Sequence, residues 1–492
     1  MAQEAQTAHG SGTKGGVPGG LGLFSLIGMV VSSCIGSGAF ALTGQLGGVA
    51  APGPALIAWL IVGVGFLCLA LSLKNLAEVR PDLDGIFNYA TQGFGPFAGF
   101  ISGWGYWLSA WLGNVAFATI MMSAVGFFYE PFLPGNTVAC IAIASVVMWG
   151  ITILVIRGVE SASFINAIVM VAKVAALALF VIFALVSFNA GVFTADFWGT
   201  LYDNAVAMGQ LGANAVSLGS VSDQIVNCMM IMFWCFIGIE GASVVSSRAK
   251  SKAEAGQATV IGLIALLVIY IGVSVLPFGV LPFNEIAAMD YPAMTYVMDH
   301  MAPGWGGAFI TIAMIVSVAG SWLSFTILPA ETTQLMADHK LIPAKWGELN
   351  SKGAPQFSLI IVGLCTQIFM LTLIFTEDAY NFAYSMCTVA IVITWALASA
   401  YNMKVSFGAG KTGQGICGLI ATVFLILGVI LNGMSFLLLT CVGYIPGVFV
   451  YIAGRKEAGE KPFTGAEMGI MGVIVAAGIA ALVMVATGII TF

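Results

Sequence analysis

Two short stretches of the sequence place glycines around a polar residue inside long apolar runs. The first is SSCIGSGAF, residues 32–40, in which Gly36 and Gly38 flank Ser37. Glycine costs roughly 1 kcal/mol relative to alanine in a helix interior. Two glycines around a serine therefore predict a break in the helix that leaves backbone groups free to bind a ligand. Close packing of two helices through these glycines is the simpler alternative.

The second stretch, FIGIEGAS at residues 236–243, adds a carboxylate to the same arrangement, because Glu240 lies between Gly238 and Gly241. A carboxylate inside an apolar run costs several kcal/mol unless it is paired or hydrated. Such residues mark a transport pathway, a coupling element or a hydrogen-bond network. A protonated Glu240 with a purely structural hydrogen bond is the alternative.

Lys173 is the other charged residue near the middle of an apolar run. A lysine that snorkels to an interface is the simple interpretation, but the central position argues against it. A third group lies between these charges in the sequence. Tyr106, Ala110 and Asn114 recur at steps of four and therefore share one face of a helix, whereas Trp107 and Trp111 belong to an adjoining face that we expect to pack.

The composition shows what kind of chain must position these residues. The chain has 492 residues, of which 60% are hydrophobic and only 8% are charged, far fewer charged residues than in a soluble domain. Repeated apolar runs of about 20 residues predict an all-α polytopic membrane protein. The nine cysteines form no CxxC pair, so we expect no disulfide framework, metal or cofactor. No phosphate loop or His/Cys/Asp cluster supports a membrane enzyme, and nothing suggests nucleic-acid binding.

The apolar runs predict thirteen membrane spans. Their approximate bounds are 22–48, 54–76, 95–128, 137–156, 161–188, 225–247, 257–281, 306–336, 357–376, 379–403, 414–431, 434–453 and 468–491. Residues 1–20 are polar and rich in glycine, and we expect a disordered leader there rather than a signal peptide.

The charges agree with this count. With the N-terminus inside, fifteen of the sixteen Lys and Arg residues fall in the inner segments and the sixteenth is Lys173. We therefore expect a cytoplasmic N-terminus in the cell membrane and, with thirteen spans, an outer C-terminus. The outer loops hold nine acidic residues, which either solvate the loops or attract cations. They are Glu130, Asp196, Asp203, Asp223, Glu285, Asp290, Asp299, Glu377 and Asp378.

The two glycine motifs lie in spans one and six, which cross the membrane in opposite directions. Matching breaks in opposed spans predict two inverted five-helix repeats with broken helices 1 and 6. The expected organisation is repeat one at 21–190, an outer loop at 191–224, repeat two at 225–403 and three C-terminal helices at 404–492.

The chain resembles the amino acid–polyamine–organocation (APC) superfamily, and within it the basic amino acid/polyamine antiporters, over roughly residues 20–455. The likeness is greatest to arginine–ornithine exchangers. It is carried by IGSGAF in helix 1, GFGPFAGFISGWGYWLSAWLGN at 93–114, FWCFIGIEGAS in helix 6 and ETTQLMADHKLIP at 331–343. The thirteenth helix departs from the twelve-helix core of that family.

The resemblance implies roles for individual residues. The helix 1 break would offer backbone groups to a substrate carboxylate, and the residues concerned are Cys34, Ile35, Gly36, Ser37 and Gly38. In helix 6, Trp234 would be a gating aromatic, with Ile237 and Gly238 beside the substrate and Glu240 coupling occupancy to gate movement.

Further roles fall on helices 3, 5 and 8. Asn114, on the face shared with Tyr106 and Ala110, would contact the distal polar group of the substrate. An aromatic of helix 8, either Trp322 or Phe325, would stack on a guanidinium. Lys173 would stand where sodium-coupled relatives hold an ion, bridging helices 1 and 8, and Glu331 is a weaker candidate for an inner network.

The expected function is sodium-independent exchange of cationic amino acids, arginine against ornithine, by alternating access. Proton-coupled symport of neutral amino acids, exchange of an amino acid for its decarboxylated amine, and a channel are the alternatives. The expected partners are small amino acids and the lipid bilayer, and the protein would be a monomer or a homodimer.

Overall fold

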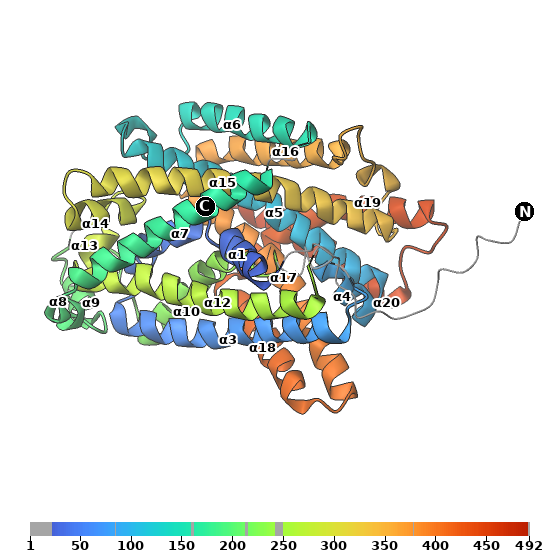
Figure 1. Cartoon of the computed structure of the whole chain (residues 1–492), viewed down its shortest axis with the longest axis horizontal. Coiled ribbons are helices and arrows are strands. Elements are labelled where there is room, and N and C mark those ends of the chain that lie inside the picture. Colours follow the sequence, from blue (N-terminus) through green and yellow to red (C-terminus); the bar gives the residue numbers. More distant parts are fainter. Residues whose placement is uncertain are drawn as a thin grey trace, which may run out of the picture.

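The computed structural model describes residues 22–83, 85–158, 162–211, 215–241, 249–376 and 378–490. Within these ranges every helix or strand assigned is a helix, as expected for an all-α membrane protein (Figure 1). The expected disordered leader at 1–20 lies outside the described residues.

The first half of the chain contains the helices of spans one to five. They are α1 (Leu23–Cys34), α2 (Ser37–Gly47), α3 (Pro52–Val79), α4 (Ile86–Phe94), α5 (Pro96–Gly126), η1 (Glu130–Phe132), α6 (Val138–Ile156) and α7 (Ala162–Val186). Two short helices, α8 (Ala190–Ala195) and α9 (Thr200–Ala207), lie in the loop that follows.

The second half holds the remaining spans and their connections. Its helices are α10 (Val221–Cys235), α12 (Lys252–Val275), η3 (Leu276–Gly279), α13 (Phe283–Ala287), α14 (Ala293–Met301), α15 (Gly306–Asp338), η4 (Ala344–Trp346), α16 (Gln356–Thr372), η5 (Leu373–Phe375), α17 (Ala379–Gly408), α18 (Thr412–Asn432), α19 (Met434–Glu457) and α20 (Gly465–Ala486).

These helices account for the thirteen expected apolar segments. In the described part of the chain, eleven helices are long and apolar enough to cross a membrane, and the bent pair α1 and α2 makes a twelfth. The sixth expected segment appears as the shorter apolar helix α10, which stops at Cys235. Residues 242–247 of that segment lie outside the described residues.

Both expected breaks are present. Between α1 and α2 the chain turns by 49°. Gly36, at the turn, has φ −114° and ψ −136°, which is not a helical conformation. After α10, residues 236–240 form turns, and Gly238 has φ +106°, a conformation that L side chains rarely adopt.

Helices of the first half pack against the helices five spans later. The second and seventh spans pair as α3 with α12, the third and eighth as α5 with α15, and the fourth and ninth as α6 with α16. The two broken spans also meet, through α2 and α10. The tenth span, α17, packs chiefly on α5 and α18 rather than on the fifth span, α7.

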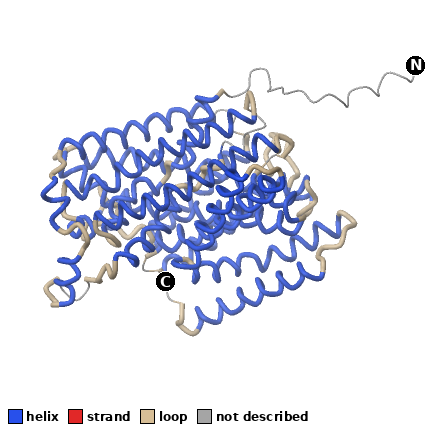
Figure 2. The backbone as a smooth tube through the Cα atoms, turned by 90° about the horizontal axis from the view of Figure 1, so that it is seen from below, coloured by secondary structure: helices blue, strands red, loops and turns tan. Residues whose placement is uncertain are grey.

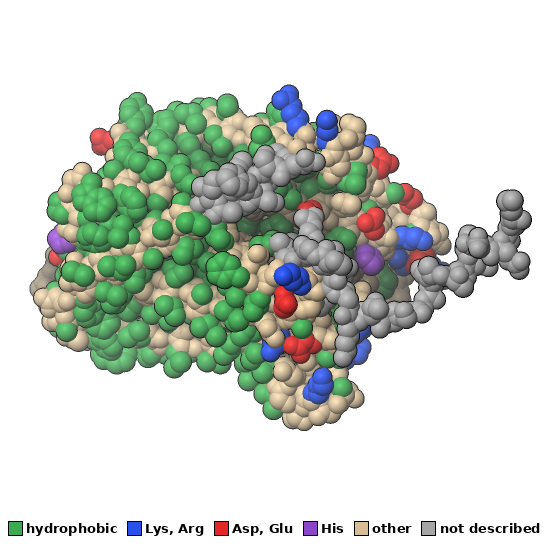
Figure 3. Space-filling view, viewed as in Figure 1, with side chains coloured by type: hydrophobic (Ala, Val, Ile, Leu, Met, Phe, Trp, Pro, Cys, Tyr) green, Lys and Arg blue, Asp and Glu red, His purple; other side chains and the backbone are tan. Residues whose placement is uncertain are grey.

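The last three helices lie outside these pairs. α18 packs against α17 and α3, whereas α20 packs chiefly on α19. Figure 2 shows the C-terminal helices along one edge of the bundle. Exposed charge is also unevenly placed, because the Lys and Arg side chains visible in Figure 3 gather towards one end of the molecule.

Candidate binding site at the two helix breaks

The carbonyl groups freed in helix 1 are bound by an ammonium from helix 5. Lys173 donates from Nζ to the carbonyl of Ile35 at 2.7 Å and to that of Ser32. The hydroxyls of Ser317 and Ser321, both on α15, reach the same Ile35 oxygen at 3.4 Å each. Lys173 is only 2% exposed, so this contact neutralises the electrostatic cost of freed carbonyls inside the bundle.

The backbone carbonyls at the break that follows α10 accept hydrogen bonds from side chains of α1 and α12. Ser33 donates from Oγ to the carbonyl of Gly238 at 2.7 Å. The hydroxyl of Tyr270 donates to the carbonyl of Cys235 at 2.9 Å. A Cβ added to Gly238 would lie 2.8 Å from the backbone of Ser33, so only glycine allows the two breaks to approach this closely.

A small cavity lies where the two breaks meet. Its volume is about 10 Å³, barely enough for one water molecule. Its lining consists of Ser33, Cys34, Gly36, Ser37, Gly38, Phe117, Trp234, Ile237 and Phe325. Most of the residues predicted from helices 1 and 6 therefore line one space, and the N-terminus of α2 begins there at Ser37. Ile35 is fully buried beside it and turns its carbonyl to Lys173.

Trp234 and Tyr380 close one side of this cavity. The indole of Trp234 donates to the Tyr380 hydroxyl at 3.0 Å, and that hydroxyl donates to Ser37 Oγ at 3.1 Å. Tyr384 packs on Trp234 with ring centroids 6.0 Å apart. A Cβ on Gly38 would meet the Trp234 ring at 2.9 Å, so this glycine lets the indole lie flat against the break.

Glu240 lies on the other side of the break and is 1% exposed. The indole of Trp395, on α17, donates to Glu240 Oε2 at 3.1 Å. The Tyr106 hydroxyl also interacts with this carboxylate. Glu240 therefore connects the break that follows α10 to α5, through Tyr106, and to α17, through Trp395.

The α5 face of Tyr106, Ala110 and Asn114 is buried, but none of the three side chains lines the cavity. Asn114 donates to the carbonyl of Phe325 at 3.3 Å, and its Oδ1 has no hydrogen-bond partner among the described residues. Ala110 is buried and lines no part of the cavity, while Tyr106 points to Glu240. Phe117, three residues beyond Asn114, is a lining residue that the sequence analysis missed, although it lies about one turn further along α5.

The structure distinguishes the two aromatic residues of α15, the eighth span. Phe325 lines the cavity and meets Phe117 edge to face with centroids 5.0 Å apart. Trp322 is fully buried and lines no part of this cavity. Glu331 lies near the C-terminal end of α15, where it lines a separate pocket with Lys352.

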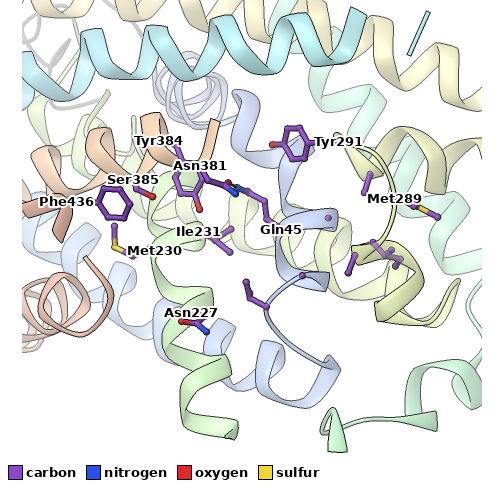
Figure 4. Close-up of a pocket in the computed structure, with 16 residues that line it drawn as sticks. Gln45, Asn227, Met230, Ile231, Met289, Tyr291, Asn381, Tyr384, Ser385 and Phe436 are labelled. Atoms are coloured by element: carbon purple, nitrogen blue, oxygen red, sulfur yellow. Dashed lines mark hydrogen bonds between the residues drawn. The ribbon is translucent and has the colours of Figure 1, made fainter. Parts of the chain in front are cut away.

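A wider vestibule opens on the far side of Trp234 and Tyr380. Its volume is about 460 Å³, and its lining includes Gln45, Asn227, Ile231, Tyr291, Asn381, Tyr384, Ser385 and Phe436 (Figure 4). Ile231 is one helical turn from Trp234, so the vestibule and the cavity lie one above the other along α10. Sequence reasoning missed the vestibule because its walls come from five separate segments.

Several of the acidic residues expected in the outer loops have hydrogen-bond partners within those loops. Asp196 accepts from the backbone N–H groups of Leu201 and Tyr202, Asp203 from that of Leu218, and Asp223 completes a capping box at the start of α10. Ordinary loop structure therefore explains part of the acidic character of these loops. Glu377 lies outside the described residues. In the part of the chain that is described, no cluster of three His, Cys, Asp or Glu side chains could hold a metal.

Comparison with known proteins assigns this arrangement to a family. The amino acid permease family profile matches residues 21–474. The chain is 49% identical to the arginine/ornithine antiporter of Latilactobacillus sakei, over 90% of this chain and 92% of that protein. It is 36% identical to the arginine/ornithine antiporter of Pseudomonas aeruginosa, over 92% and 95% of the two chains. It is 35% identical to the arginine/agmatine antiporter of Chlamydia caviae, over 90% and 92%.

Proposed function

This chain belongs to the amino acid permease family, and on that premise we propose that it exchanges cationic amino acids, arginine against ornithine, by alternating access without sodium. The observation that carries the proposal is the likeness, over nine-tenths of the chain, to proteins named arginine/ornithine antiporters. The site supports it with a cavity at paired helix breaks, reached from a vestibule past two aromatic side chains.

The cavity supplies groups for both ends of such a substrate. The first N–H groups of α2, at Ser37 and Gly38, carry the positive end of the helix dipole and bind the carboxylate. Phe325 stacks on the flat guanidinium, and the unpaired Oδ1 of Asn114 accepts one of its N–H groups. Because the empty cavity holds about 10 Å³, Trp234 and Phe325 must swing aside as the substrate enters.

Lys173 makes sodium unnecessary in this mechanism. Its ammonium lies between the freed carbonyls of helix 1 and the hydroxyls of Ser317 and Ser321, an oxygen set that would suit a small cation. The lysine fills that position and links helices 1, 5 and 8. Glu240 is placed to couple movement of the helix 6 break to helices 3 and 10.

The same proposal includes the orientation and the repeat boundaries. The Lys and Arg residues gather at the end that we assign to the cytoplasm, with the N-terminus there and repeats at 21–190 and 225–403. The vestibule then opens to the outside, and the membrane is the cell membrane.

The test is uptake of labelled arginine into proteoliposomes that contain the full chain. We expect rapid uptake only when ornithine is inside, with no effect of sodium or of an imposed potential. Equal uptake into empty vesicles would contradict exchange. Preference for leucine would support the symport alternative, and exchange that requires internal agmatine would favour the amine alternative.

A further inference from the structure

The vestibule contains an amide oxygen that is buried and has no partner. Gln45 is 9% exposed, and its Oε1 lacks a hydrogen-bond partner among the described residues. Its Nε2 donates to Asn381 Oδ1 at 2.7 Å. Figure 4 shows these two side chains meeting inside the vestibule. A buried acceptor without a donor costs free energy, so its presence indicates a ligand.

The orientation of both amides is fixed from outside the vestibule. Asn381 Nδ2 donates to a carboxylate oxygen of Asp378. An ionised carboxylate only accepts, so the NH₂ group of Asn381 must face it. Asn381 Oδ1 then faces the NH₂ group of Gln45, which leaves Gln45 Oε1 as a buried acceptor without a donor in the wall of the vestibule. The carboxylate thus determines the polarity of the whole chain of amides.

Other lining groups suit the same kind of ligand. The hydroxyl of Tyr291 interacts with that of Tyr380, and the ring of Tyr291 lines the vestibule. The rings of Tyr291, Tyr384 and Phe436 offer aromatic faces to a cation, and the lining holds no Lys or Arg. The preferred ligand is therefore a cation that carries only N–H donors.

We propose that the vestibule is a second binding site, which holds the guanidinium or ammonium head group of an incoming cationic amino acid before Trp234 and Tyr380 part. The proposal rests on the proposed function for the identity of the transported substrate. The site reads the head group alone, because its lining offers no basic side chain to a carboxylate. Agmatine, which has the guanidinium but no carboxylate, competes there as well as arginine does.

The transport test compares the two faces of sealed vesicles in which every chain has one orientation. Gln45→Met removes the acceptor and keeps the length of the side chain. We expect a roughly fivefold to tenfold higher KM for arginine on the vestibule side, with the maximal rate and the KM on the opposite side unchanged. An unchanged KM, or an equal rise on both sides, would overturn the proposal.

Gln367→Met is the matched control. Gln367 lies on α16, where it bonds to Trp149 and Ser145 away from the vestibule. The same substitution there leaves both KM values unchanged, which separates a local effect from general loss of an amide.

A binding measurement separates this site from the transport function. Equilibrium dialysis of labelled arginine against the purified chain counts two bound molecules in the wild type, and Gln45→Met and Phe325→Ala each weaken one of the two about fivefold to tenfold. If arginine proves not to be transported, Gln45-dependent binding of arginine still supports the vestibule site. A single molecule bound in the wild type and unaffected by Gln45→Met would overturn it.

Discussion

Ser33 Oγ donates a hydrogen bond of 2.7 Å to the carbonyl of Gly238 and joins the two broken helices directly. The two residues are 205 positions apart in the sequence. The same carbonyl also accepts from the backbone N–H of Gly241 at 2.8 Å, within the turn where Gly238 has φ +106°. The two broken helices are therefore hydrogen-bonded to each other beside the cavity.

Loss of this bond should disturb exchange more than folding. Ser33→Ala removes the side-chain donor to the carbonyl of Gly238, which keeps only the N–H of Gly241, at a cost of about 0.5–1.5 kcal/mol in the state that makes the bond. We expect normal insertion and a roughly fivefold or greater change in exchange rate, measured as arginine uptake into ornithine-loaded vesicles. Ser324→Ala, which removes only a bond to Gly320 within its own helix, is the control and should change little.

Lys173 should be essential for transport and for stability. Lys173→Ala removes the ammonium donor from the carbonyls of Ser32 and Ile35, so we expect a lower melting temperature and loss of most exchange. Sodium should not stimulate arginine uptake by the wild-type chain at any concentration. Sodium-dependent uptake by the wild-type chain would contradict the assigned role.

Glu240→Gln tests whether a titratable group is needed at the helix 6 break. Glutamine keeps the size and still accepts from the Trp395 indole, but it cannot take up or release a proton. We expect retained arginine binding, slower exchange and an altered dependence on pH between about 5 and 8. Wild-type rates at every pH in that range would show that Glu240 is a structural residue.

The two aromatics of helix 8 should respond differently to truncation. Phe325→Ala removes a wall of the cavity, and we expect KM for arginine to rise about tenfold with little loss of stability. Trp322 is fully buried away from the cavity, so Trp322→Ala should lower the free energy of unfolding by about 3–5 kcal/mol while KM stays close to wild type. The reverse pattern would assign the stacking role to Trp322.

The helical architecture and both breaks could be predicted because they depend on local composition. Apolar runs determine where spans form. Gly36, Gly38 and Gly238 lower the stability of a helix whatever other helices surround it. Short loop helices such as α14 escaped prediction, since nothing in their hydrophobicity distinguishes them from an ordinary connection.

The partners around the breaks could not be predicted in the same way. Tyr380 and Trp395 lie on α17, well over 100 residues from the Trp234 and Glu240 groups that they bind. A pattern within one helix shows which residues share a face, but not which distant helix covers that face. The unpaired Oε1 of Gln45 is similarly invisible in the sequence, because it follows from a chain of amide contacts between separate spans.

The position of Lys173 has a consequence for how the exchanger is powered. The Lys173 ammonium is covalently part of the protein, so its local concentration does not depend on the medium. It therefore occupies the oxygen site between helix 1 and α15 at any salt concentration. The lysine cannot dissociate to one side, and no sodium gradient can therefore transfer free energy to the substrate through that site. Accumulation of arginine on one side is then limited by the ornithine gradient alone.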